Sequence, residues 1–245
     1  MEPGRKTPEH RVKASERFAR HERRGEARLP AVLATLVAIL LYVALPAQLL
    51  LGPRFVLPAL EVLLLIPLIA VNPRRMTRQN RVSRTLSLAL VAVIGVSNLA
   101  SLGLLVHAMV TKQASNGGSL LLAALQVWAT NIIIFGLAFW ELDRGGPVVR
   151  TQADRCDLPL ADFRFSQDEN DDAIEEVADG SARRSDWVPT LMDYLYVSVT
   201  DSTAFSPTDT MPLSTRAKAL MSMESVSALI TTLLVIAHAV GVLDS

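Results

Sequence analysis

Long runs of apolar residues constrain this chain more than any other feature. A helix that crosses a bilayer needs about 20 consecutive, predominantly apolar residues. Runs of this kind occupy positions 29–51, 86–110, 120–140 and 218–243, and a shorter run that contains two prolines occupies 56–71. Half of all residues are hydrophobic and only 20% are charged. The sequence therefore predicts an all-α integral membrane protein with five transmembrane helices.

The stretch between the fourth and fifth predicted spans adds a further membrane element. Residues 187–199 are typical of a helix too short to cross a bilayer, and residues 200–212 are too polar to face lipid. Irregular backbone at membrane depth is tolerated only where protein or a water-filled cavity surrounds it. We therefore expect one re-entrant half-helix and loop, followed by the last transmembrane helix.

These elements divide the chain into four parts. Residues 1–28 are a charged cytoplasmic arm, and residues 29–142 are a four-helix transmembrane region. Residues 143–186 are an acidic polar loop whose acid spacing does not match an EF-hand. Residues 187–245 contain the pore-loop-like half-helix, the turn and the last transmembrane helix.

The basic residues of the polar segments indicate the orientation in the membrane. The N-terminal arm and the loop at 72–84, which contains five arginines, lie on the same side of the first pair of spans. The positive-inside rule places both in the cytoplasm. We therefore expect a multi-pass protein of the cell membrane with a cytoplasmic N-terminus.

The segment DYLYVSVTDSTAFSPTDTMPLSTRAKAL resembles the pore segment of two-helix potassium channels. Without gaps, Thr203, Asp209 and Pro212 fall on the filter-entry threonine, the aspartate and the proline of that family. Ser206 and Thr208 stand where the family has its two filter glycines. The resemblance covers about sixty residues and implies a cation pore, but it lacks the glycine filter.

The missing glycines matter because a potassium filter is a stack of backbone carbonyls that replaces the hydration shell of the ion. Glycine adopts the required backbone angles without the steric cost that Ser and Thr incur. Pro207 also fixes its own φ and restricts the residue before it. Two interpretations stay open: a pore loop with an unorthodox filter, or a structural re-entrant turn with another role.

The direction of the loop gives a third alternative. Potassium-channel pore loops enter from outside, whereas the loop charges here indicate entry from the cytoplasm, as in the pores of ionotropic glutamate receptors. A different number of spans would reverse the predicted side from which the loop enters. The run at 56–71 is the weakest candidate for a span, because it is short and contains two prolines.

The chain is also similar to a widespread bacterial multi-pass membrane protein family of unknown activity. The stretches that carry the similarity are FWELDRGGP, ADFRF, DYLYVSVTDSTAFSPTDTMPLS and the helix that follows. The similarity supports the architecture and implies no particular reaction.

Polar residues inside the apolar segments are the functional candidates, since such residues are costly in a membrane. Glu224 and Thr231 are seven residues apart, which places them on one face of the last helix. The candidates for a pore or cation site are Thr200, Ser202, Thr203, Ser206, Thr208, Asp209, Glu224 and Thr231. Asp209 and Glu224 are expected to approach one cavity, which the hydroxyls of the turn surround.

A second polar cluster is predicted from Glu61, His107 and Gln126, which lie at similar depths in three spans. It is interpreted either as a structural hydrogen-bonded group or as a proton or cation relay. The histidines lack the neighbouring ligands of a zinc site. No nucleophile motif or phosphate loop is present, so no enzyme activity, metal or cofactor is predicted.

The leading functional hypothesis is therefore a cation-channel-like or transport-related membrane protein. Its expected partners are the lipid bilayer, a monovalent cation and further copies of the same chain, without nucleic acid. The alternative is a non-conducting scaffold or sensor that contacts partners through its cytoplasmic segments.

Overall fold

The structure is a computed structural model that describes residues 25–111, 117–154, 157–169, 179–185, 187–204 and 209–243. Its described part is mostly helical, which confirms the all-α prediction. Three of its helices are α4 (Arg81–Val110), α5 (Gly117–Leu142) and α10 (Thr215–Leu243). Each contains a segment long and apolar enough to span a membrane, consistent with a membrane protein.

Helices α2 (Leu29–Val43) and α3 (Val56–Val71) are short for transmembrane spans, and α2 is also shorter than the predicted run at 29–51. They contain 15 and 16 residues. At 1.5 Å per residue they are about 22–24 Å long, less than the ~30 Å hydrocarbon core. The predicted span at 29–51 is divided because Pro46 has extended backbone and a 3-10 turn, η1 (Ala47–Leu49), follows it.

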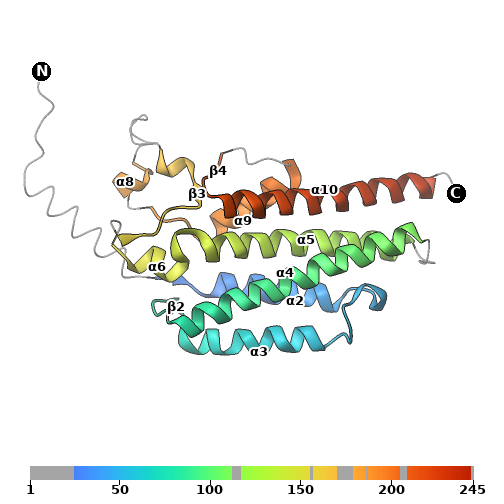
Figure 1. Ribbon diagram of the computed structural model, residues 1–245, viewed down its shortest axis with the longest axis horizontal. Coiled ribbons are helices and arrows are strands. Elements are labelled where there is room, and N and C mark those ends of the chain that lie inside the picture. The colour runs from blue at the N-terminus through green and yellow to red at the C-terminus, as the bar shows by residue number, and fades with distance from the viewer. Residues whose placement is uncertain are drawn as a thin grey trace, which may run out of the picture.

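Helix α5 is the centre of the bundle (Figure 1). Helices α2, α4, α9 (Leu191–Ala204) and α10 all pack against α5, and α3 packs on the outer side of α4. The buried apolar residues form two clusters along these contacts, one toward each end of the bundle. Because α5 contacts so many neighbours, most of its spanning segment is buried, in contrast to α4 and α10.

A small strand pair joins the beginning of the described chain to the arginine-rich loop. Strand β1 (Glu26–Ala27) pairs antiparallel with β2 (Arg75–Met76). Inside this loop the Asn72 side chain accepts from two backbone N–H groups, and Asn80 forms a capping box at the start of α4. The chain before α2 and the loop before α4 therefore lie at the same end of the bundle, as the sequence predicted.

The segment predicted to be a polar loop, 143–186, contains regular structure and buried residues in its described part. Phe163 and Phe165 belong to the aromatic core, and Asp143 and Asp162 are buried. Its composition is polar, but these acids are buried because they have hydrogen-bond partners on neighbouring elements. The elements are η2 (Asp143–Gly145), α6 (Pro147–Gln152), β3 (Phe163–Arg164), η4 (Ser166–Asp168) and α8 (Ala182–Ser185).

Helix α9 packs against α5 and α10. At its start the Asp193 carboxylate accepts from the backbone N–H and the hydroxyl of Thr190 at 2.7 and 2.9 Å. After α9 the chain returns to strand β4 (Met211–Pro212), which pairs with β3 at the end where α9 began. The prediction that the polar turn starts at Thr200 is wrong, because α9 continues to Ala204.

Candidate functional site

Two buried carboxyl groups meet between α9 and α10. Glu224 of α10 has no exposed surface, and Asp201 of α9 is 2% exposed. Two reciprocal hydrogen bonds hold these acids close together, because Ser202 beside Asp201 donates to Glu224 and Ser225 beside Glu224 donates to Asp201. An acid at such a position has lost its hydration, so it is tolerated only when polar neighbours replace the water.

Serine hydroxyls surround this carboxyl pair. Ser202 donates to Glu224 Oε1 at 2.9 Å, and Ser225 donates to Asp201 Oδ1 at 2.9 Å. The Ser198 hydroxyl also bonds Glu224 Oε1 and lies 2.8 Å from the carbonyl oxygen of Ile132. A hydroxyl has one proton, and a carbonyl oxygen only accepts. When Ser198 donates to Ile132, its bond to Glu224 requires a proton on Glu224.

The remaining oxygen of each carboxyl group supports the same conclusion. Asp201 Oδ2 and Glu224 Oε2 are buried and have no hydrogen-bond donor among the described residues. Ionised carboxylates only accept hydrogen bonds, so two of them in contact repel each other. One shared proton supplies the missing donor and removes the repulsion. The arrangement is therefore a site that can hold or release a proton, or exchange it for a small cation.

The polar contacts extend from this pair toward α5 and α4. Ser227, one turn after Glu224, donates to Asn131 Oδ1 of α5 at 3.2 Å. Asn98 of α4 donates to the same oxygen at 3.4 Å. All three residues are buried. Polar side chains from four helices thus form a chain through an otherwise apolar bundle.

Ser202 of the predicted turn lies at Glu224, whereas the described hydrogen bonds of Thr200 and Thr203 stay within α9. Thr200 and Thr203 lie on the last turns of α9, and their hydroxyls bond carbonyl oxygens of the same helix. Ser206 and Thr208 lie outside the described residues. Asp209 is exposed, whereas Asp201 is buried and linked to the Glu224 region through Ser202 and Ser225.

Three of the predicted site residues are buried: Ser202, Glu224 and Thr231. Ser202 and Glu224 contact each other, as described above. Thr231 donates to the backbone carbonyl of Ser227 and lies two turns further along α10. Its position on the face of Glu224 agrees with the predicted seven-residue spacing, although its hydroxyl is used within the helix.

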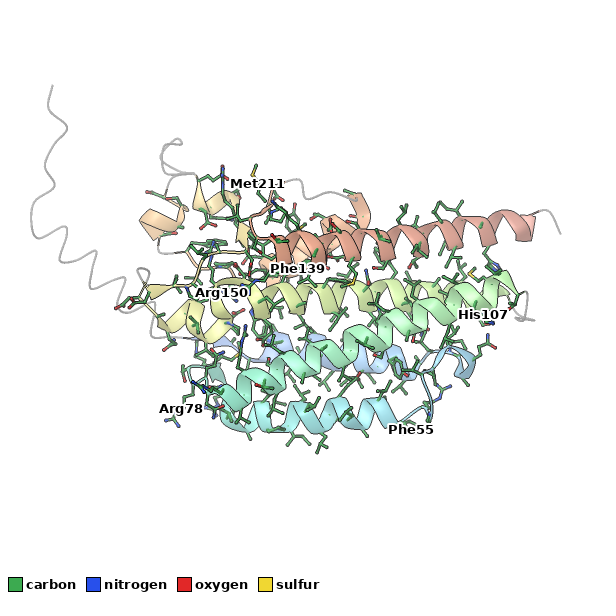
Figure 2. The ribbon with its side chains drawn as sticks, viewed as in Figure 1. Phe55, Arg78, His107, Phe139, Arg150 and Met211 are labelled. Carbon is green, nitrogen blue, oxygen red and sulfur yellow. The ribbon has the colours of Figure 1, made fainter. Side chains whose placement is uncertain are left out.

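The second predicted cluster is not formed by direct contacts. No hydrogen bond among the described side chains joins Glu61, His107 and Gln126. Glu61 is buried with Oε2 lacking a partner, and Gln126 Oε1 lacks one too. His107 is exposed near the end of α4, at the opposite end of the bundle from Arg78 and Arg150 (Figure 2).

Sequence reasoning missed Asp201, Ser198 and Ser225 as site residues. A signal was present: Ser198, Asp201 and Ser202 are spaced three and four residues apart, which places them on one face of a helix. The prediction placed 200–212 in a turn and therefore divided this face between two elements.

A cluster of ion pairs and hydrogen bonds holds the beginning of α9 at the end of α5. Asp143 accepts from the Tyr194 hydroxyl at 2.5 Å and from the backbone N–H of Asp162 at 2.7 Å. The Asp162 carboxyl group in turn binds Arg216 at 2.5 Å and Ser214 at 2.5 Å, both at the start of α10. The starts of α9 and α10 are thereby fixed relative to α5, and with them the two helices that carry the carboxyl pair.

Glu26 adds the chain before α2 to this cluster. Its carboxyl oxygens accept from Trp140 Nε1 at 2.8 Å and from the backbone N–H of Leu191 at 2.7 Å, and Arg150 lies 3.6 Å away. Burial raises the pKa of Glu26, while the Arg150 charge opposes that shift. A carboxyl at the first turn of α9 also suits the positive end of the helix dipole.

The stretches FWELDRGGP, ADFRF and DYLYVSV come together in this cluster. They supply Asp143, Asp162, Tyr194 and aromatic rings in tilted contact; the Phe139 and Phe163 centroids, for example, are 5.0 Å apart at an interplanar angle of 57°. These three stretches therefore position the start of α9.

Comparisons with known proteins assign no function to these residues. The chain matches no family model, no curated protein and no solved structure. Among the described residues, no group of three or more His, Cys, Asp or Glu side chains could hold a metal ion. The function proposed below rests on the contacts of Asp201 and Glu224.

Proposed function

We propose that this chain is a transport-related membrane protein that carries a proton, or a monovalent cation in its place, on the Asp201–Glu224 pair. The observation that carries the proposal is the pair of buried carboxyl groups on facing helices, each bound by a serine that is next to the other acid in the sequence. Intramembrane acids of this kind mark ion pathways and proton relays in membrane proteins.

In this proposal the chain crosses the membrane five times, and α9 is re-entrant. Helices α2 and α3 are short for a span, but a bilayer can thin locally or flanking residues can snorkel at a modest cost. Both helices expose large apolar side chains, such as Leu40 at 65% and Leu63 at 65%, as lipid-facing helices do. The arginine-rich loop supports a cytoplasmic position for the end that holds β1 and β2.

The burial of the pair favours a carrier or a gated pathway over a permanently open pore. Glu224 has no exposed surface, so an ion cannot reach it until α9 and α10 move apart. All the groups of the site come from one chain, so the homo-oligomer implied by the channel resemblance is not required for ion binding. The non-conducting scaffold or sensor is the competing function.

Ion flux into liposomes tests this proposal. The protein is reconstituted into liposomes that contain a dye selective for H⁺, Na⁺ or K⁺, and a gradient of the matching ion is imposed on each. Asp201→Asn and Glu224→Gln are each expected to reduce flux at least tenfold. The double variant is expected to lose no more than either single variant, because the pair acts as a unit.

Asp209→Asn is the matched control, since it removes an exposed acid of the same region. It is expected to keep the flux of the unmodified protein. If the pure protein passes none of the three ions above empty liposomes, transport is refuted and the scaffold or sensor function is favoured.

A further inference from the structure

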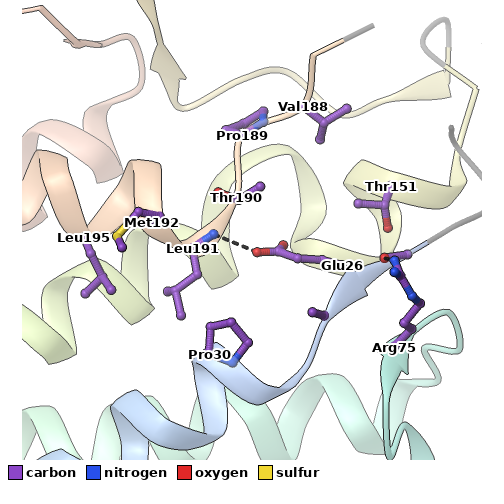
Figure 3. Close-up of a pocket in the computed structure, with 12 residues that line it drawn as sticks. Glu26, Pro30, Arg75, Thr151, Val188, Pro189, Thr190, Leu191, Met192 and Leu195 are labelled. Carbon is purple, nitrogen blue, oxygen red and sulfur yellow. Dashed lines mark hydrogen bonds between the residues drawn. The ribbon is translucent and has the colours of Figure 1, made fainter.

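A hollow separate from the carboxyl pair opens at the end of the bundle that holds β1 and the start of α9 (Figure 3). Its volume is about 490 Å³, within the range of ~300–1,000 Å³ that small-ligand sites occupy. Helices α2 and α9 both pack against α5 but scarcely touch each other, which leaves this space between them.

The walls of this cavity are mostly apolar. Pro30 of α2 lies on one side, and Leu191, Met192 and Leu195 of α9 lie on the other. Met192 is 73% exposed. Apolar surface of this kind is stable in a bilayer only when hydrocarbon or another protein covers it.

One rim of the cavity is basic. The Arg75 guanidinium lies at the rim and donates to the carbonyl oxygen of Gly25 at 2.9 Å. Arg75 belongs to the loop 72–84, which has five arginines and no acidic residue. Glu26 also lines the cavity, but its carboxyl oxygens accept hydrogen bonds from Trp140 and Leu191. The nearby Arg150 offsets its negative charge.

We propose that this cavity binds one phospholipid from the surrounding membrane leaflet. Its acyl chain lies between Pro30 and the α9 side chains, and its phosphate lies beside Arg75. The inference rests on the membrane location of the proposed function, but not on ion transport. A second copy of the chain suits the cavity less well, because a symmetric contact would bring two arginine-rich loops together.

Native mass spectrometry of the full-length protein, released from membranes in mild detergent, tests the proposal with dioleoyl phosphatidylglycerol as the added probe. One bound lipid per chain is expected. Arg75→Gln is expected to weaken its retention about fivefold, the effect typical of one basic residue at a membrane surface. Arg74→Gln is the matched control: it makes the same charge change at the preceding residue, which does not line the cavity.

Met192→Glu is a second test variant, because it places a charge on the exposed apolar wall without disturbing a buried contact, and it is also expected to release the lipid. An equal loss of bound lipid in Arg74→Gln and Arg75→Gln would overturn the proposal, because it would indicate a general attraction between the basic loop and anionic lipid. Displacement of the lipid by inorganic phosphate, or a delipidated dimer with no bound lipid, would also overturn it. Glu224→Gln is expected to retain the lipid, which separates this result from a failure of transport.

Discussion

Replacing Arg150 by methionine tests the cluster that holds α9 in place. Arg150 is 2% exposed and donates to the backbone carbonyl oxygens of Trp140, Asp143 and Pro189 at 3.0–3.1 Å. Its guanidinium carbon also lies 4.9 Å from the centre of the Tyr194 ring. One side chain thereby joins the end of α5 to the residue just before α9.

The expected loss of stability follows from what methionine leaves behind. Methionine fills a similar volume but donates no hydrogen bond, so the buried carbonyl oxygens of Trp140 and Pro189 lose the Arg150 donor, and that of Asp143 keeps only the Gly146 N–H. Glu26 also loses its counter-charge at 3.6 Å. Breaking one partner of a buried ion pair costs about 3–5 kcal/mol. In a chain of this size that corresponds to a melting temperature about 6–20 °C lower.

Thermal unfolding of the purified protein in detergent, followed by tryptophan fluorescence, measures this loss. Arg81→Met is the control, because Arg81 is exposed at the start of α4 and its removal is expected to change the melting temperature by less than about 2 °C. Arg150→Lys is expected to recover little, since an ammonium group cannot reproduce the geometry of the guanidinium. A loss in Arg150→Met no larger than in Arg81→Met would refute the assigned role of Arg150.

Two further outcomes follow from the described contacts. Gly136→Ala is expected to destabilise the protein by about 1–3 kcal/mol, because a Cβ there would lie 2.7 Å from Leu195 of α9. The control Gly95→Ala, whose Cβ meets nothing closer than 3.6 Å, is expected to be neutral or stabilising. Equal melting temperatures of the two variants would contradict this expectation. Burial raises the pKa of Glu26 above 4.5, so the folded state binds the Glu26 proton more tightly than the unfolded state does. Glu26 therefore contributes stability at acid pH, and this contribution is lost as the pH rises through the raised pKa. The stability of the unmodified protein minus that of Glu26→Gln should therefore fall between about pH 4 and neutral pH in thermal unfolding, and a difference that grows with pH would show that the sign is wrong.

Helix positions were predictable because apolar runs and prolines act locally. Sequence analysis placed the second apolar helix at 56–71, and α3 spans the same residues, with Pro67 accommodated inside it. It did not predict that the first run divides after Val43, since a proline at position 46 is compatible with a kink as well as a break.

The site was less predictable because its contacts join distant parts of the chain. Glu224 was identified from its position in an apolar helix, but its partner Asp201 depends on how α9 lies against α10. Likewise, the polar composition of 143–186 indicated a solvated loop, whereas Asp143 and Asp162 are buried against Tyr194 and Arg216. Composition reveals how many polar groups a segment has, but not whether other segments supply their partners.

We propose that Asp201 and Glu224 share one proton, and infrared difference spectroscopy of the protein in lipid membranes detects such a proton. At neutral pH the unmodified protein should show the C=O stretching band of a protonated carboxylic acid. Glu224→Gln should change or remove this band, while Asp209→Asn should leave it unchanged. A spectrum in which Glu224→Gln leaves every protonated-carboxyl band unchanged would contradict the shared proton and, with it, the proposed ion-carrying site.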